Sequence, residues 1–307
     1  MAGFSQGSRS SLSFGVQSDF VTPATAPFTA LPFKTHSLDL SKERLEGQDI
    51  QSDRMPRIDR HGNRNAAGSV DIDLRKGDYD DLIESVMLNT FDGSNELRVG
   101  TTPKFLTIED AAEDISQYRL YTGMAANSMS VSVVPNQMVE TTFELVGRDM
   151  VQSGASSAGA VNPSSANAPY DSYNGALFEG GTTAGDIINL VTSIDFSITN
   201  SFAPTFVVGS DIAPHLEYGR AVVEGTVTAY YQDAALINKF LNEVETELQV
   251  TVDEPSGANP MTFYFPRVKF NGSNVPLANE QSRTIEIPFV SLYDTTANSN
   301  LVITRTP

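Results

Sequence analysis

Gly68-Ser69-Val70-Asp71-Ile72-Asp73-Leu74, followed by Asp80-Asp81-Leu82-Ile83, returns 157 residues later as Gly225-Thr226-Val227-Thr228-Ala229-Tyr230-Tyr231, followed by Asp233-Ala234-Ala235-Leu236-Ile237. Leu38–Ser41 likewise returns 156 residues later as Ile194–Ser197, and Glu140–Leu145 returns near the end of the chain as Arg283–Phe289. The order is preserved and only the loop lengths differ, so the pattern predicts one structural unit present twice. Chance similarity between two β-rich halves is the alternative.

Each unit is predicted to be mainly β with one flanking helix. Alternation of apolar and polar residues, as in Val70–Leu74, is typical of a half-buried strand. Asp233–Leu248 carries apolar residues at helical spacing and is the clearest helix of the chain. Short strands separated by turn residues fill the rest of both halves, which favours a β-sandwich or barrel with a helix packed against it.

The chain divides into four predicted segments. Residues 1–30 form an extended N-terminal arm, because Ser, Gly, Thr, Pro and Ala fill most of its positions. Residues 31–151 form the first domain, and its segment 41–67 is too charged to supply much core, which predicts a long loop or an extended hairpin. Residues 152–185, with two charged side chains, are a flexible linker or insertion, and residues 186–307 form the second domain.

Composition excludes several classes of protein. The 307 residues suffice for two domains with real cores, and no apolar run approaches the roughly 18 residues that span a bilayer. The chain has no cysteine, which excludes disulfides and thiolate metal sites and fits a protein made in a reducing cytoplasm. Its net charge of −18 repels nucleic acid over most of the surface.

The sequence contains no catalytic constellation, so we expect no catalytic residue, metal or cofactor. His36, His61 and His215 lie far apart, and none has the spacing of a histidine metal site. Neighbouring carboxylates such as Asp71 and Asp73 could in principle serve glycoside hydrolysis, but the chain has no Trp to form a sugar platform.

The sequence resembles the major tail (tail tube) proteins of long-tailed, siphovirus-like bacteriophages. The resemblance rests on Phe14–Ser18 with Thr22-Pro23, the polar segment after Leu38, Gly68–Leu74 before an acidic helix, Thr122–Asn136, and Glu140–Gly147. It covers nearly the whole chain, although this chain carries two units where single-domain members carry one. The resemblance implies tail-tube-like β-sandwich domains, six of which surround a lumen in rings that stack into a tube for genome delivery.

On this basis the chain is expected in the virion tail, made in the host cytoplasm, with itself as its main partner. Two units per chain favour a ring of three chains with pseudo-sixfold symmetry, and a ring of six chains is the alternative. Tape measure, tail terminator and distal tail proteins are the other expected partners, DNA passes without specific binding, and no membrane insertion is expected. A tandem β-sandwich adhesin or tail decoration protein is the competing function, and an enzyme with dispersed carboxylates is a third.

Three sets of residues are predicted to carry the function. The acidic lumen-lining candidates are Asp39, Asp71, Asp73, Glu140, Glu144, Asp195, Glu224 and Glu286. Because side chains alternate along a strand, we expect some of these to face elsewhere. The inter-ring contact candidates are Lys42, Arg44, Arg54, Arg57, Arg60 and Arg64, and the anchors of the arm on a neighbouring chain are Phe4, Phe14, Phe20 and Phe28.

Overall fold

The computed structural model describes residues 4–50, 52–53, 55, 57–181, 190–232, 234–276 and 282–307, and it is mainly β with two short α-helices. The first half contains β1 (Ser10–Val16), β2 (Thr29–Ala30), β3 (Thr35–His36), β4 (Asp39–Glu46), β5 (Asp59–Asp73), α1 (Asp80–Met87), β6 (Glu96–Arg98), β7 (Leu106–Ala112), β8 (Gln117–Val133), β9 (Glu140–Gly147) and β10 (Asp149–Ser153). The second half contains β11 (Asp171–Glu179), β12 (Val191–Thr199), β13 (Ala203–Thr205), β14 (His215–Glu217), β15 (Val222–Tyr230), α2 (Ala235–Leu241), β16 (Thr246–Asp253), β17 (Met261–Phe270), β18 (Thr284–Ser291) and β19 (Val302–Arg305). In these ranges neither helix has the length and apolar character needed to cross a membrane.

The two halves pair their strands in the same order. In the first half, β3 and β4 pair with β5, β5 pairs with β9, β9 with β8 and β8 with β7. In the second half, β12 pairs with β15, β15 with β18, β18 with β17 and β17 with β16. All of these pairs are antiparallel, and a helix follows the second strand of each series. The strand order therefore repeats as the residue pattern does.

Two glycines mark equivalent positions in the repeats. A Cβ atom on Gly68 would lie 2.5 Å from the backbone oxygen of Ser37, and a Cβ on Gly225 would lie 2.5 Å from that of Asp195. Ser37 therefore corresponds to Asp195, an offset of 158 residues, whereas the sequence pattern matched Asp39 to Asp195. The pattern was wrong by two residues here. A shift of two keeps every side chain on its own face of the sheet, which is why the alternation concealed it.

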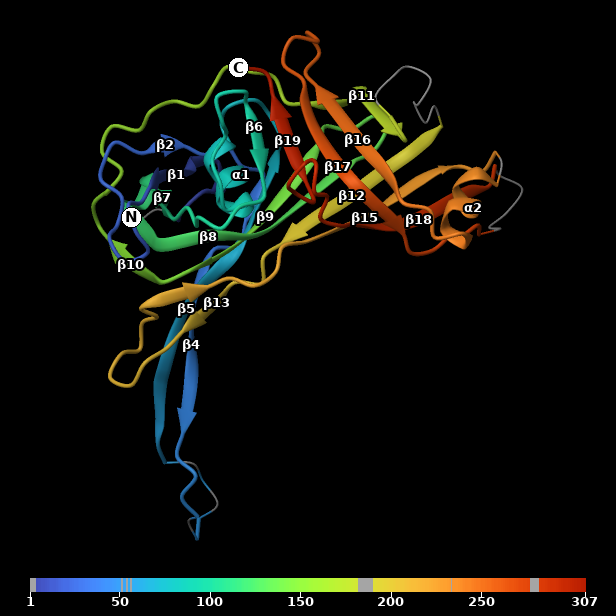
Figure 1. The fold of residues 1–307 in the computed structure, drawn as a ribbon. Coiled ribbons are helices and arrows are strands. Elements are labelled where there is room, and N and C mark those ends of the chain that lie inside the picture. Colours follow the sequence, from blue (N-terminus) through green and yellow to red (C-terminus); the bar gives the residue numbers. More distant parts are fainter. Residues whose placement is uncertain are drawn as a thin grey trace.

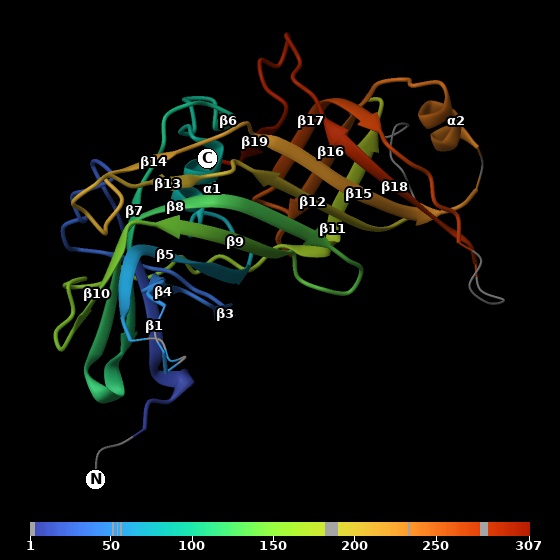
Figure 2. The same ribbon diagram turned by 90° about the horizontal axis from the view of Figure 1, so that it is seen from below.

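A single sheet runs through both halves. β12 pairs with the C-terminal part of β8, from Ile194 opposite Val133 to Thr199 opposite Ser128. The result is a continuous antiparallel sheet in the order β5–β9–β8–β12–β15–β18, which crosses the molecule in Figures 1 and 2. The sheet does not close into a barrel.

The buried face of this sheet packs on a second layer of strands. In the first half that layer contains β10, the N-terminal part of β8, β7, β1 and β2, and in the second half it contains β11, β16, β17 and β19. Apolar side chains from both halves, among them Ile72, Phe143, Phe196 and Phe289, form one contiguous core. β19 also pairs with β6, so the C-terminal strand ties the second half to the first.

The N-terminal arm is extended, but part of it belongs to the first sandwich. β1 pairs along its whole length with β7, from Ser10 opposite Ala112 to Val16 opposite Leu106. Leu12 and Phe14 are buried. The arm is therefore part of the chain's own fold from Ser10 onward, which the prediction of an extended arm did not include. The alternation of Leu12, Phe14 and Val16 with small residues was the overlooked signal of a strand.

The Ser- and Ala-rich segment after β10 lies along the first half as an ordered strap. Its backbone bonds to residue 28, because Phe28 N donates to Ala158 O (3.0 Å) and Asn162 N donates to Phe28 O (2.8 Å). Tyr170 is buried, and its N–H donates to Leu74 O (2.8 Å). The expectation of a flexible linker is not met over residues 152–181, and residues 182–185 lie outside the described ranges.

The second helix is shorter than its pattern predicts. Its α-helical turns end at Leu241, and Glu243 adopts a left-handed φ of 53°. The chain then enters β16 at Thr246, where Leu248, Val250 and Val252 are buried. Apolar spacing alone therefore overextended the helix, since β-branched residues beyond it pair with β17 instead.

Candidate functional site

The exposed face of the six-stranded sheet is polar. In β9 the side chains of Thr141, Phe143 and Leu145 are buried, and those of the alternate residues point to the opposite side. The strand registers carry this polar side across the sheet, through the pairs Asp73–Glu140, Glu140–Ser132, Ser132–Asp195, Asp195–Thr226 and Thr226–Pro288. We call this surface the polar face.

All eight acidic candidates fall on the polar face. Asp71 lies opposite Thr142, Glu144 lies opposite Ser69, and Glu286 lies opposite Thr228. Asp39 lies opposite Ala67 and follows Ser37 with the spacing of two that keeps it on the same side. We expected some of these side chains to point to the opposite face of the sheet. That expectation is wrong, because the strand registers place all eight at positions whose side chains point to the polar face.

Two of the carboxylates at the β5–β9 end of this face have close polar partners, Asp71 through hydroxyl donors and Glu140 through a lysine. Hydrogen bonds from the Thr142 hydroxyl (2.6 Å) and from the Thr35 hydroxyl lower the pKa of Asp71. Lys34 forms an ion pair with Glu140, which raises the pKa of the lysine, and its Nζ lies 3.4 Å from Asp73. Lys34 thus offsets part of the negative charge at the β5–β9 end of the face.

Hydroxyl side chains fill the space between the carboxylates. A shallow depression on the polar face is lined by residues that include Ser130, Ser132, Thr142, Ser197 and Thr226. The Ser132 hydroxyl donates to Asp195 across the β8–β12 pair. These residues were not among the candidates, although the alternation of serines with Met129 and Val131 is visible in the sequence. The surface is acidic and hydrogen-bonding.

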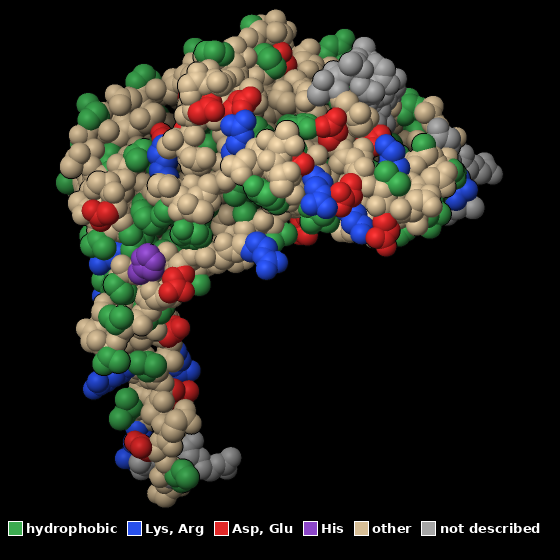
Figure 3. Space-filling model, in the orientation of Figure 1, with side chains coloured by type: hydrophobic (Ala, Val, Ile, Leu, Met, Phe, Trp, Pro, Cys, Tyr) green, Lys and Arg blue, Asp and Glu red, His purple; other side chains and the backbone are tan. Residues whose placement is uncertain are grey.

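The charged segment 41–67 forms the greater part of a long antiparallel hairpin of β4 and β5. It projects from the body of the molecule in Figure 1 and carries charged and apolar side chains together in Figure 3. Arg44 Nε lies 2.9 Å from Asp59, and Arg57 lies 2.7 Å from Asp53. Two of the six inter-ring candidates are therefore neutralised within the hairpin itself.

The remaining cationic candidates differ in their surroundings. Arg64 lies at the base of the hairpin, with Nε 2.7 Å from Asp211 and Nη1 3.4 Å from Asp149. The hydrogen bond from Arg64 is the main reason that the pKa of Asp211 is lowered, and the nearby charge of Lys42, which is exposed, lowers it further. Arg60 is exposed and forms no ion pair with a described residue. Arg54 lies outside the described residues.

The hairpin also exposes apolar side chains that the charge pattern concealed. Leu45, Ile50, Met55 and Ile58 are respectively 55%, 100%, 67% and 49% exposed. Such a cluster at the end of a projecting hairpin is typical of a surface that another protein covers. The candidates predicted from the sequence in this segment are all charged residues and include none of these four.

The four aromatic residues predicted to anchor the arm differ in their solvent exposure. Phe14, Phe20 and Phe28 are buried in the chain's own structure, so they are not free to dock on a neighbour. Phe4 is 94% exposed. The anchor hypothesis is therefore wrong for three of the four residues and stays a prediction for Phe4.

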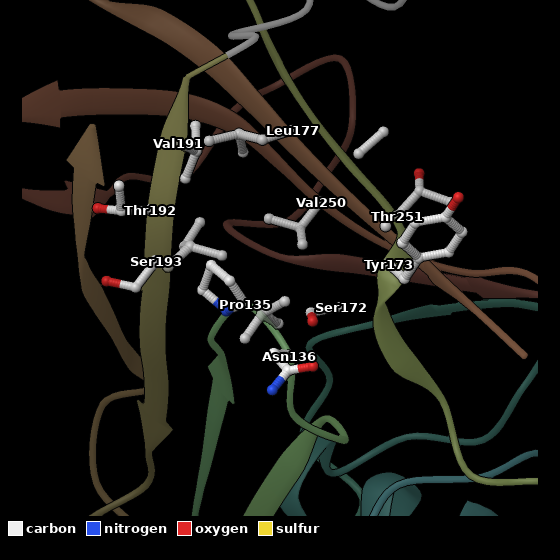
Figure 4. A pocket seen from close by; sticks show the side chains of 14 residues that line it. Pro135, Asn136, Ser172, Tyr173, Leu177, Val191, Thr192, Ser193, Val250 and Thr251 are labelled. Carbon is white, nitrogen blue, oxygen red and sulfur yellow. The ribbon is translucent and has the colours of Figure 1, made fainter. Parts of the chain in front are cut away.

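A cavity of about 610 Å³ has no charged residue in its lining. It lies between the β8–β9 turn, β11, β12 and β16, and its walls include Val133, Pro135, Leu177 and Val250 (Figure 4). Its fourteen lining residues contain no Asp, Glu, His, Lys or Arg. Within the described ranges no group of three or more His, Asp or Glu could hold a metal ion.

Comparison with known protein families shows which family the chain belongs to. The family model described as phage tail tube protein matches residues 7–291. Among curated proteins none matches the chain. Because the family match covers nearly the whole sequence, the chain belongs to the phage tail tube protein family. It is a structural protein of the virion tail that self-assembles into a tube and contacts other tail proteins, and this membership suggests a non-enzymatic role.

Proposed function

We propose that the polar face lines the lumen of a tube made of stacked rings, through which the phage genome passes into the host. The observation that carries this proposal is the placement of eight carboxylates, drawn from both halves, on one face of a continuous sheet. The opposite face is the hydrophobic core, so the polar face is the side of the sheet that remains for water.

An acidic, hydroxyl-rich wall suits a conduit for DNA. Duplex DNA carries one negative charge per roughly 1.7 Å of its axis, and a basic wall would bind it and release counterions. Carboxylates act on the phosphates over about 8 Å at physiological ionic strength. The wall therefore repels the passing duplex at short range, and its hydroxyls keep it wetted.

Each ring contains three chains in this proposal. Two copies of one strand order lie side by side in each chain, so three chains supply six units around the lumen. A ring of six chains with the second half outside the tube is the alternative. In that alternative, β12, β15 and β18 would not line the lumen, although they continue the sheet of the first half.

The hairpin makes the contacts between stacked rings in this proposal. Leu45, Ile50, Met55 and Ile58 are about half to fully exposed in the described part of the hairpin. The charge of the hairpin is nearly balanced, with six Lys or Arg against five Asp or Glu in residues 41–67. The rest of the chain carries 14 Lys or Arg against 33 Asp or Glu, so a neutral hairpin can approach a neighbouring copy without strong repulsion.

Cysteine labelling tests the lumen assignment directly, because the chain has no cysteine of its own. In Glu224→Cys tubes, a small maleimide that enters the bore should react, and a maleimide on a protein-sized carrier should not. The unassembled variant should react with both. Equal reaction of assembled tubes with the large reagent would place Glu224 outside and refute the proposal.

A further inference from the structure

The pairing of β8 with β12 inside one chain is a template for the joint between chains. Along this joint Ser130 lies opposite Ser197 and Val131 lies opposite Phe196. In a ring of repeated units, the last unit of one chain must meet the first unit of the next as the two units meet here. The inference rests on the proposed ring and concerns which edges close it.

The edge equivalent to β8 lies just beyond β17. Pairing of β8 with β9 shifts by one residue between Ala126–Leu145 and Ser130–Thr142. Pairing beyond β17 shifts in the same way, between Phe270–Phe289 and the bridge Asn274–Glu286. Asn274 is therefore the counterpart of Ser130, and no described strand lies on its far side, where β12 would lie in the first half.

The edge equivalent to β12 is formed by β3, β4 and the residues between them. Since Ser37 corresponds to Asp195, Asp39 corresponds to Ser197. Ser37 N–H donates to Ser69 O on β5, so alternation directs the backbone groups of His36, Leu38 and Leu40 to the other side. No described strand pairs with that side.

We propose that residues 272–276 of one chain pair antiparallel with residues 37–41 of the next chain in the ring, with Asn274 opposite Asp39. Val275 then lies opposite Leu38 and exchanges backbone hydrogen bonds with it, as Val131 does with Phe196. Leu38 O already accepts the Tyr121 hydroxyl (2.9 Å) and Val275 O accepts the Arg283 guanidinium (3.2 Å). Each carbonyl oxygen has a second lone pair for this joint.

The side chains at this joint are complementary. Asn274 Nδ2 donates to Glu286 (3.2 Å) on the polar face, and its second N–H is available to a carboxylate across the joint. Asp39 is exposed on the same face and supplies that carboxylate. The joint therefore joins an amide donor to an acceptor, where the internal joint joins two serines.

Disulfide trapping tests the register. Residues 130 and 197 form a non-hydrogen-bonded pair, whose Cα atoms lie about 4.5 Å apart in antiparallel sheets, within the range a disulfide bridges. Ser130→Cys with Ser197→Cys should close within one chain. Asp39→Cys with Asn274→Cys should close between chains and give dimers and trimers on a non-reducing gel. Asp39→Cys with Ser273→Cys, which turns one thiol to the opposite face, should crosslink at least tenfold less.

The possible outcomes separate the joint from the ring. Rings or tubes seen by electron microscopy, with the internal pair closed but no Asp39→Cys/Asn274→Cys crosslink, would overturn the joint and leave the tube intact. Crosslinked ladders that extend beyond three chains would support the joint and contradict the three-chain ring. A wild-type chain that forms neither rings nor tubes would refute the proposed function itself.

Discussion

Replacing Phe28 with alanine should destabilise the subunit strongly, because the arm is part of the first sandwich. Phe28 is fully buried, and its ring lies so close to Gly15 that a Cβ there would be 2.9 Å from Phe28 Cδ1. Truncation of a buried phenylalanine removes the transfer free energy of the ring and leaves a cavity, at a cost of about 3–5 kcal/mol. Each kcal/mol shifts Tm by about 2–4 °C in domains of 150–250 residues, so we expect a loss of roughly 6–20 °C.

The matched control is Phe4→Ala, since Phe4 is 94% exposed and should change the unfolding free energy by less than about 0.5 kcal/mol. Thermal unfolding of unassembled subunits, followed by circular dichroism, measures both variants without the added stability of the tube. If Phe28→Ala unfolds within 2 °C of the wild type, the arm does not contribute to the core and the account of residues 10–30 is wrong.

Three further predictions concern the sheet, its charge and the hairpin. Gly225→Ala should lower the free energy of unfolding, measured by urea titration, by about 1–3 kcal/mol. The added Cβ would lie within 2.8 Å of Asp195 O and of two phenylalanine side chains. A loss below about 0.5 kcal/mol would contradict this packing. The pKa of Asp71 is lower in the folded subunit than in the unfolded chain, where it is about 4. Asp71 therefore stabilises the folded subunit above about pH 4, and this contribution is lost as the pH falls through the folded pKa. A pKa above about 4 for the Asp71 carboxyl, measured by NMR titration, would contradict this. Leu45→Ser with Ile58→Ser should leave the Tm of the subunit nearly unchanged, since both side chains are about half exposed, and should impair polymerisation measured by light scattering; normal tubes would show that these side chains make no inter-ring contact.

The sequence predicts the fold class and the family, and both are confirmed. Alternation in Val70–Leu74 and helical spacing in the residues after it are local signals that the tertiary structure preserves. The same alternation placed the acidic residues in strands, and all eight proved to share one face. Their assignment to a lumen stays a prediction.

Other features depend on contacts that no local pattern records. Lys34 reaches Glu140 across more than a hundred residues, and the pairing of β8 with β12 joins segments separated by the strap. The strap looked flexible because Ser and Ala dominate it, yet Ser156 and Ser157 bond to the buried carboxylate of Glu109. A small-residue segment can therefore be ordered by its backbone and by one acidic partner.

The central claim is that both halves of each chain stand in the wall of the tube, three chains to a ring. Native mass spectrometry of a single ring, released from the tube under mild conditions, measures this most directly. The account predicts a mass of three chains of 33.2 kDa. A ring of six chains would contradict it, because the second half would then lie outside the wall and the continuous sheet could not line the lumen.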